Sequence, residues 1–330
     1  MRIVIVGPGA LGCLFACRLA QKSAQYAKQD EIILLDHRPE RAEALSRSGL
    51  ALYEMDGSVT RAYPLVTAHP ENMAGADLVL VCVKSTALAD CLDARRELFA
   101  TSALTVFIQN GINHLDLADS ETFAMAFAST TEGANLVSMS EARHAGRGLT
   151  YFGLLHIPGD GERARLEKIA EYFSQAGLAA TVCADIRDRI WQKLLINAGI
   201  NALTALHDCP NGALPRNPAW REQMAALVEE ARQVAMAAGV ATPPDAFAKV
   251  LEICQATAQN ISSMLQDVRA GRSTEIEAIN GAVVRLGEKF GVATPVNAEI
   301  TRRVRALRQG KSDACHFNKT IQGGSHGTEK

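Results

Sequence analysis

Short runs of consecutive apolar residues alternate with longer amphipathic stretches over the first half of the chain. These runs are apolar at adjacent positions, as expected of strands in a sheet that is covered on both faces. The pattern predicts parallel strands joined by helices, with strands at 2–6, 31–35, 77–83, 104–108 and 123–128. Two later strands are predicted at 151–153 and 179–183, with a helix at 162–176 between them.

From Asp185 the pattern changes to a helical period that continues almost to the end of the chain. The predicted helices are 185–206, 218–239, 244–271 and 274–291, with a turn at 209–212 and a last helix opening at Pro295. The sequence therefore predicts an α/β domain over residues 1–184 and an all-α domain over residues 185–330. The polar segment 311–330 is expected to be a flexible tail.

Composition narrows the class of protein. The chain has 330 residues, enough for about two domains, and 34 basic against 36 acidic side chains give a net charge of −2. No run of like charge indicates nucleic acid or an anionic membrane as partner. The longest apolar runs have about six residues, whereas a spanning helix needs about twenty, so we expect a soluble, cytoplasmic protein. Eight cysteines without a Cys-x-x-Cys pair predict reduced thiols and no structural metal.

A glycine-rich loop follows the first predicted strand and opens the first helix. It reads Gly7-Pro8-Gly9-Ala10-Leu11-Gly12, and Asp36 ends the next predicted strand. This is the full context of a dinucleotide-binding fingerprint, in which glycines let a pyrophosphate approach the N–H groups of a helix N-terminus. A purely structural turn is the alternative. We therefore expect the α/β domain to be of the Rossmann type.

Two further polar loops follow predicted strands, at the edge where parallel sheets bind ligands. Lys84-Ser85 comes after the third strand, and Gln109-Asn110-Gly111 comes after the fourth. Either segment is also compatible with ordinary loop chemistry, because Asn-Gly is a common turn and lysines after strands are usually solvated. Their shared position favours a functional role.

One helix of the second domain carries a polar stripe. Lys193, Asn197 and Asn201 are spaced i, i+4, i+8 and so share one face of a helix that is otherwise rich in Ile, Leu and Trp. Asn is a poor residue for a helix interior, so the stripe indicates a ligand. A narrow solvated face is the alternative.

A second polar segment lies near the end of this domain. Asn260 and Ser263 are three residues apart and would share a helix face. Thr274 and Glu277 fit a capping box, and Glu275 in a first turn would be favoured by the helix dipole in any protein. Spacing alone therefore leaves Glu275 open between a functional and a structural role.

These residues together resemble the ketopantoate reductase family (2-dehydropantoate 2-reductase), and the resemblance extends to about residue 308. The motifs that carry it occur in the family's order: the glycine loop, Lys84-Ser, Gln-Asn110-Gly, Trp-x-Lys193-x-x-x-Asn197-x-x-x-Asn201, Cys-Pro-Asn211-Gly, Asn260-x-Ser-Ser263-Met, Thr-Glu275-Ile and Asn280-Gly. The resemblance implies that Lys193 is the general acid, with Glu275 as a second catalytic residue beside it. The implied substrate contacts are Asn110, Asn197, Asn201, Asn211, Asn260 and Ser263. The implied cofactor contacts are residues 7–12, Lys84, Asn110, Ala134 and Glu275.

The resemblance implies reduction of a 2-oxo acid, 2-dehydropantoate, to (R)-pantoate in pantothenate and coenzyme A biosynthesis. Two alternatives remain: a related 2-oxo-acid reductase, and a non-catalytic dinucleotide-sensing protein, which would have no reason to keep Lys193. Family members are often homodimers, but the sequence does not determine the oligomeric state.

The choice of nicotinamide cofactor depends on the end of the second strand, which reads Leu35-Asp36-His37-Arg38. A carboxylate at Asp36 would bond the ribose hydroxyls of NADH and repel a 2′-phosphate. Arg38 could turn inward and neutralise it. Family habit favours NADPH, so we expect NADPH with Arg38 as the phosphate partner, while NADH stays open because of Asp36.

Overall fold

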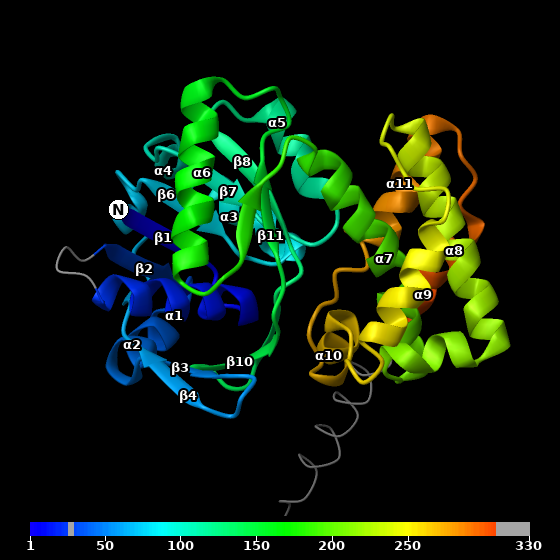
Figure 1. Cartoon of the computed structure of the whole chain (residues 1–330), viewed down its shortest axis with the longest axis horizontal. Coiled ribbons are helices and arrows are strands. Elements are labelled where there is room, and N and C mark those ends of the chain that lie inside the picture. Colours follow the sequence, from blue (N-terminus) through cyan, green and yellow to red (C-terminus); the bar gives the residue numbers. More distant parts are fainter. Residues whose placement is uncertain (26–29, 308–330) are drawn as a thin grey trace, which may run out of the picture. The chain divides into compact units, whose positions relative to one another are not determined.

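The computed structural model describes residues 1–25 and 30–307 (Figure 1). The flexible tail predicted at 311–330 lies outside the described residues. The chain divides into two compact units, Met1–Ile190 and Trp191–Lys330. The division falls inside helix α7 (Ile186–His207), and the domain boundary predicted at 184/185 stands just before this helix.

The first unit is built on an eight-stranded sheet with the strand order β12-β11-β8-β7-β6-β1-β2-β5. The six neighbouring strands β8-β7-β6-β1-β2-β5 run parallel to one another. Strand β11 is antiparallel to β8, and β12 is parallel to β11. The bounds of its strands are β1 (Arg2–Val6), β2 (Glu31–Leu35), β5 (Leu65–Thr67), β6 (Leu78–Val81), β7 (Thr105–Phe107), β8 (Met125–Thr130), β11 (Thr150–Gly153) and β12 (Ala180–Val182). The predicted Rossmann-type sheet is confirmed, with several strands shorter than predicted and with an edge strand, β5, that was not predicted.

Helices and short helical turns join these strands. Their bounds are α1 (Ala10–Ala24), α2 (Pro39–Ser48), η1 (Pro70–Met73), η2 (Ser85–Ala87), α3 (Leu88–Asp93), α4 (Arg96–Ala100), η3 (Asn113–Asp116), α5 (Leu117–Ser120) and α6 (Asp160–Gln175).

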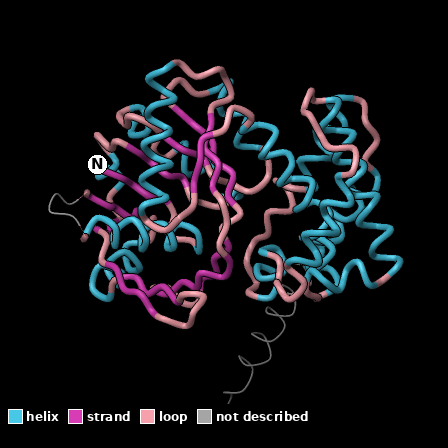
Figure 2. The backbone as a smooth tube through the Cα atoms, in the orientation of Figure 1, coloured by secondary structure: helices cyan, strands magenta, loops and turns pink. Residues whose placement is uncertain are grey.

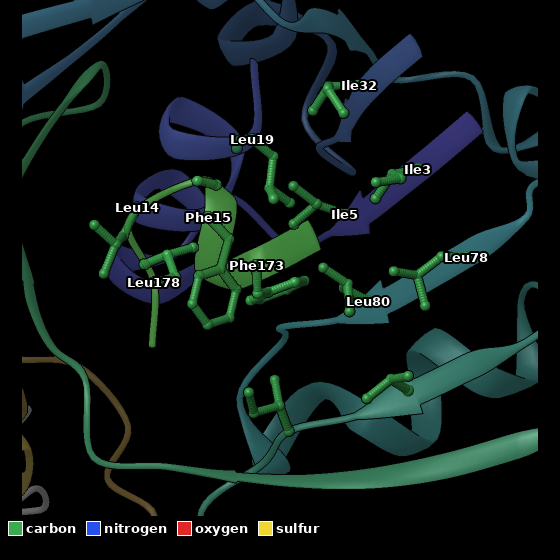
Figure 3. Packing of buried hydrophobic residues seen from close by; sticks show 14 of the residues in the cluster. Ile3, Ile5, Leu14, Phe15, Leu19, Ile32, Leu78, Leu80, Phe173 and Leu178 are labelled. Carbon is green, nitrogen blue, oxygen red and sulfur yellow. The ribbon is translucent and has the colours of Figure 1, made fainter. Parts of the chain in front are cut away.

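Both faces of the large sheet are buried, which explains the consecutive apolar positions in its strands. On one face, Ile3 and Ile5 of β1 join Phe15 of α1 and Phe173 of α6 in a core cluster (Figure 3). The rings of Phe15 and Phe173 meet edge to face, with centroids 5.3 Å apart. On the other face, Phe99 of α4 stacks on the ring of Phe123. The pleat alternates side chains between these two layers.

A second, four-stranded sheet was not predicted. It consists of β3 (Leu50–Tyr53), β4 (Val59–Ala62), β9 (Gly133–Leu136) and β10 (Glu141–Gly146), in the order β4-β3-β10-β9. Its central pair, β3 and β10, is parallel and joins segments far apart in the sequence. Helix α1 packs against this sheet as well as against the large one.

The described part of the second unit is all helical, as predicted (Figure 2). Its elements are most of α7, η4 (Asn211–Arg216), α8 (Pro218–Ala237), α9 (Ala246–Ala256), α10 (Ser263–Arg269), α11 (Asn280–Phe290) and helical backbone at 295–307. Helix α7 packs closely on α8: a Cβ at Gly199 would lie 2.7 Å from Cγ2 of Val228.

Two helix predictions in this unit are wrong. The helix predicted at 244–271 is broken between α9 and α10, because the backbone of this segment bonds to another loop. The N–H groups of Asn211 and Gly212 donate to the carbonyls of Asn260 and Ala258, at 3.0 and 3.1 Å. Asn260 therefore lies in a loop and does not share a helix face with Ser263.

The capping box predicted at Thr274 is also absent. Helix α11 begins at Asn280 with Ile279 as its N-cap, so Glu275 lies before the helix and not in its first turn. The carboxylate of Glu277 instead pairs with Arg305 at 2.7 Å.

None of the helices in the described ranges combines the length and apolar character that a membrane crossing requires. Seven cysteines in these ranges are free thiols. Burial raises the pKa of Cys13 to about 11 and that of Cys17 to about 12.

Candidate active site

The glycine loop connects β1 to α1, and its three glycines differ in what surrounds them. Gly7 has φ +100°, and a Cβ on Gly12 would lie 2.1 Å from the carbonyl oxygen of Gly7. These two glycines are therefore required by the turn and by the close approach of helix and strand. At Gly9 the nearest atom to a Cβ would be the carbonyl oxygen of Cys82, 4.0 Å away. Space beside the Gly9 backbone is thus open.

The N-terminus of α1 has the character of an anion site. Gly9 is its N-cap and provides no side-chain cap, and the first turn contains no acidic residue. Ala10 and Leu11 are partly exposed while Pro8 is buried. The N–H groups of this turn and the helix dipole are therefore available to a phosphate.

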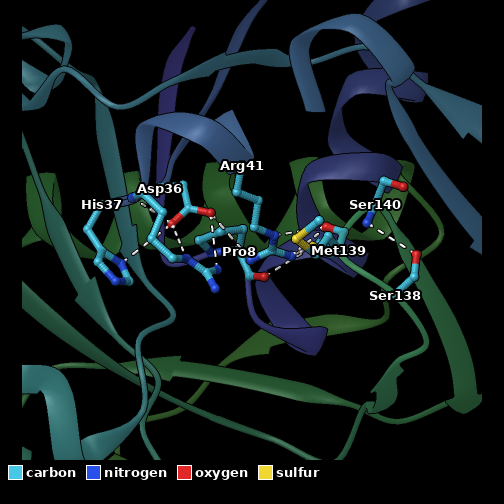
Figure 4. Close-up of polar contacts among 9 residues, drawn as sticks. Pro8, Asp36, His37, Arg41, Ser138, Met139 and Ser140 are labelled. Atoms are coloured by element: carbon cyan, nitrogen blue, oxygen red, sulfur yellow. Dashed lines mark hydrogen bonds and ion pairs between the residues drawn. The ribbon is translucent and has the colours of Figure 1, made fainter. Parts of the chain in front are cut away.

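Asp36 lies directly after β2 and is completely buried. Its Oδ1 accepts hydrogen bonds from the backbone N–H and from Nε of Arg38, both at 3.1 Å, and its Oδ2 accepts from Nη2 of Arg38 at 3.2 Å. Nη1 of Arg41 reaches the same Oδ2 at 3.4 Å (Figure 4). The inward turn of Arg38 considered from the sequence is present, and a second arginine accompanies it.

Lys84 and Asn110 follow the adjacent parallel strands β6 and β7, in which Val81 pairs with Phe107. Both residues are partly exposed. Gln109, which follows β7, links the ends of the two strands by hydrogen bonds. Its Nε2 donates to the carbonyl of Val81 at 2.7 Å and to that of Val83 at 3.1 Å. This bond brings the two loops to one edge of the sheet, as their position after strands predicted.

Ala134 is placed elsewhere in the first unit. It lies on β9 of the small sheet, opposite His144 of β10, and packs with Leu11 against the core cluster. The fold thus packs β9 against helix α1.

The stripe of Lys193, Asn197 and Asn201 lies on α7 as predicted, because the whole segment is one continuous helix. Lys193 and Asn197 are partly exposed and Asn201 is buried. Trp191 and Leu194, on either side of Lys193, are buried. The stripe is therefore a polar strip in a mostly apolar helix surface.

The ammonium group of Lys193 is poorly solvated. Burial lowers the pKa of Lys193 from 10.5 to about 8, and the negative charge of Glu275 acts in the opposite direction. Glu275 is itself 7% exposed. The structure thus brings a buried carboxylate into electrostatic contact with the lysine, and the pKa lies where an amine can donate and accept protons near neutral pH.

Asn211 and Asn260 are brought together by the loop pairing that breaks the predicted helix. Asn211 is buried, and its Nδ2 donates to Oγ1 of Thr257 at 2.9 Å. That hydroxyl in turn donates to the carbonyl of Ile253 at 2.6 Å. The buried Oδ1 of Asn211 has no hydrogen-bond partner in the described part of the chain. Asn260 is exposed beside it.

Ser263 is the first residue of α10 and is exposed, whereas the preceding Ser262 is buried. Oγ of Ser262 caps α10 by accepting from the N–H of Leu265 and lies 2.7 Å from Oγ1 of Thr204. Thr204 bonds the carbonyl of Asn201 in α7 at 3.0 Å. This chain of bonds fixes the start of α10 against the asparagine end of the stripe.

Sequence reasoning did not identify Arg41, Thr257 or the Ser262–Thr204 pair. Gln109 was noted only as part of a loop motif. A buried arginine five residues after an acidic residue at a strand end is a weak signal in sequence, because Arg on a helix is usually solvated. The others gain their roles only from contacts between distant segments.

A dinucleotide-dependent oxidoreductase is the class of protein that these features define: a parallel sheet, an open glycine loop, and a desolvated lysine beside asparagines. Comparison with known proteins specifies the family. Residues 3–156 match the ketopantoate reductase PanE/ApbA family model, and residues 185–308 match the model of its C-terminal domain. The chain belongs to the ketopantoate reductase family.

Individual relatives agree with this assignment. The 2-dehydropantoate 2-reductase of Halobacterium salinarum is 35% identical over 94% of this chain and 100% of its own length. A ketopantoate reductase structure from Ralstonia eutropha is 30% identical, with a TM-score of 0.84 over 94% of this chain and all of that chain. A D-mandelate dehydrogenase in complex with NADH and anilino(oxo)acetate is 27% identical, also with a TM-score of 0.84, over 94% and 99% of the two chains.

Proposed function

We propose that this protein reduces the keto group of 2-dehydropantoate to give (R)-pantoate, with NADPH as reductant, in pantothenate and coenzyme A biosynthesis. The observation that carries the proposal is the desolvated Lys193 on the polar stripe of α7, with a pKa of about 8. An amine with this pKa is a competent general acid at neutral pH.

The residues of the first unit fit a dinucleotide. The open space at Gly9 and the uncapped first turn of α1 suit a pyrophosphate, because a Cβ at this position would fill the approach. Lys84 and Asn110, held at one sheet edge by Gln109, are polar groups for the remainder of the cofactor. When bound, a reduced nicotinamide supplies hydride to the keto carbon.

The role of Lys193 follows from the charge that appears on the substrate. As the keto carbon is reduced, its oxygen gains negative charge, which the Lys193 ammonium stabilises before transferring a proton from Nζ to that oxygen. Asn197 and Asn201 donate hydrogen bonds from their amides without acting as acids. Glu275 keeps Lys193 protonated by raising its pKa.

NADPH is the cofactor that the end of β2 favours. The Asp36 carboxylate already accepts three hydrogen bonds from Arg38 and is completely buried, so its oxygens are occupied. The side chain of Arg38 is 48% exposed and bears a positive charge for a 2′-phosphate.

The buried Oδ1 of Asn211 favours a substrate that carries a hydroxyl group. Because Nδ2 of Asn211 is held by Thr257, the free oxygen can only accept a hydrogen bond. 2-Dehydropantoate has a primary hydroxyl that can donate to it. An unpaired buried acceptor is costly, so a substrate lacking this donor would be selected against.

The second candidate is reduction of an aryl 2-oxo acid, which the similarity to the D-mandelate dehydrogenase structure favours. The two functions share the lysine and the glycine loop and differ in the groups that surround the substrate side chain.

A panel of 2-oxo acids assayed with NADPH and NADH tests the proposal. We expect the highest kcat/KM for 2-dehydropantoate with NADPH. Preference for phenylglyoxylate would favour the second candidate, and turnover of neither would contradict both. Replacement of Asn211 by Ala should reduce kcat/KM for 2-dehydropantoate more than for 2-oxo acids without a hydroxyl group.

A further inference from the structure

Arg41 of the surface helix α2 has a buried side chain, which is unusual for an arginine. Its side chain is 4% exposed, although it lies on the first turns of a short surface helix. Nη1 reaches Oδ2 of Asp36, and Nε and Nη2 donate to the carbonyl of Met139 at 2.9 and 2.7 Å. Figure 4 shows this guanidinium between Asp36 and the Met139 segment.

These contacts join two loops that are distant in sequence. Asp36 directly follows β2 of the large sheet, and Met139 lies in the loop between β9 and β10 of the small sheet. Nη2 of Arg41 also lies 4.0 Å from Sγ of Cys13, which in turn bonds the carbonyl of Pro8 in the glycine loop. Arg41 thus has its nitrogens engaged by the protein and is not available as a phosphate ligand itself.

The Asp36 carboxylate and its two arginines add to an excess of one positive charge, and the ring Nδ1 of His37 lies 3.4 Å from Oδ1 of Asp36. Asp36 contributes −1, and Arg38 and Arg41 each contribute +1. Arg41 is buried and fixed, whereas Arg38 is about half exposed. Because the buried Arg41 balances the negative charge of Asp36, the positive charge of the exposed Arg38 remains available to a bound anion. Without Arg41, Arg38 would only cancel the carboxylate.

We infer that Arg41 is a positioning residue that selects 2′-phosphorylated dinucleotides, by neutralising Asp36 and so leaving the charge of Arg38 for the phosphate. The inference rests on the dinucleotide site of the proposed function. It assigns the selectivity to a buried residue that does not touch the cofactor.

Direct binding measurements on the full chain test this role. The dissociation constants of NADPH and NADH are obtained from nicotinamide fluorescence, and competition by 2′-AMP against 5′-AMP isolates the phosphate contribution. In Arg41→Met the net charge of the site falls to zero. We expect NADPH to bind about tenfold more weakly, as for loss of one charge-assisted interaction, with NADH binding unchanged or tighter.

Two further variants separate this role from a structural one. Asp36→Asn combined with Arg41→Met restores the excess positive charge, and NADPH affinity should return to within a few-fold of the unmodified protein. Arg47→Met removes an exposed arginine from the same helix and should leave the NADPH to NADH ratio unchanged. The double variant contains no unpaired buried charge, so it carries the test even where Arg41→Met fails to fold.

The possible results distinguish failure of the role of Arg41 from failure of the proposed reaction. Equal weakening of NADPH and NADH in Arg41→Met, or no recovery in the double variant, overturns the role of Arg41 while leaving the proposed reaction intact. If the unmodified protein binds NADH as tightly as NADPH, the proposed cofactor and the role of Arg41 both fail. Failure of the proposed substrate would instead appear in the 2-oxo acid panel alone.

Discussion

Two charged side chains, one in each unit, differ in how far neighbouring charges compensate for the water that they lose. Asp36 is completely buried but accepts hydrogen bonds from two arginines, so its charge is compensated. Lys193 is desolvated with Glu275 offsetting only part of the cost, and its pKa falls to about 8. A compensated charge fixes geometry, whereas an undercompensated one titrates near neutral pH. The first suits recognition and the second suits proton transfer.

Replacement of Lys193 should have the largest effect of the changes considered, because it removes the undercompensated charge. In Lys193→Met we expect kcat to fall by about 10² to 10⁴, the usual range for loss of a general acid. The dissociation constant of NADPH should stay nearly unchanged, because the glycine loop belongs to the first unit. Steady-state kinetics and fluorescence titration measure both, and near-normal turnover in a folded variant would exclude the role.

The same variant should remove the pH-dependent contribution that Lys193 makes to stability. The pKa of Lys193 is lower in the folded state than the 10.5 of an unperturbed lysine, so folding disfavours its protonated form. Its contribution destabilises the folded protein below pH 8, and stability therefore rises between about pH 8 and 10.5. Thermal melting across this range should show the rise in the unmodified protein and less of it in Lys193→Met.

The pH profile of turnover sharpens the comparison further. A general acid must be protonated, so the rate of keto reduction should be level below pH 8 and fall up to tenfold per pH unit above it. Because Glu275 raises the pKa of Lys193, Glu275→Gln should move the midpoint to lower pH. An unchanged midpoint would show that Glu275 does not act on the lysine.

Gly9 and Gly12 test whether the glycine loop binds a dinucleotide or only turns the chain. Gly9→Ala meets no atom closer than 4.0 Å, so the fold should persist while dinucleotide affinity falls about tenfold. Gly12→Ala would clash with Gly7 and should lower the melting temperature. Equal affinity in folded Gly9→Ala would contradict the binding role.

The smallest expected effect is at Arg38. Arg38→Ala should raise the KM for NADPH at least several-fold, because the exposed charge that faces the 2′-phosphate is lost, with little change for NADH, because Arg41 still neutralises the Asp36 carboxylate. A preference of the unmodified enzyme for NADH would show instead that Asp36 dominates.

The large sheet and the α7 stripe were predictable because each depends on local periodicity. Consecutive apolar residues identified β1 and β2, and spacing placed Lys193 and Asn197 on one helix face. The small sheet was missed because most of its strands lack an apolar run; β10, for example, reads Glu-Ala-Arg-His-Ala-Gly. Its central pairing joins Ala51 to Glu141, which no local pattern reveals.

The misassigned segments of the second unit share one cause. Neither Gly nor Pro marks the break between α9 and α10, and the break follows from backbone bonds to Asn211 and Gly212. Glu277 fits a cap by spacing but is held by Arg305. Tertiary contacts override local propensity in both places, so the candidate residues could be named from sequence, but not how they are held.

The burial of Cys13 affects how the protein responds to oxidants and alkylating reagents. Its sulfur lies beneath the glycine loop, 3.5 Å from the carbonyl of Pro8, where oxidation would disturb the loop. Burial raises its pKa to about 11, so at neutral pH roughly one thiol in 10⁴ is the reactive thiolate. Peroxide or an alkylating reagent should therefore leave dinucleotide affinity unchanged. Cys13 should resist reagents that attack thiolates, and the glycine loop above it should keep its geometry when the protein is exposed to them.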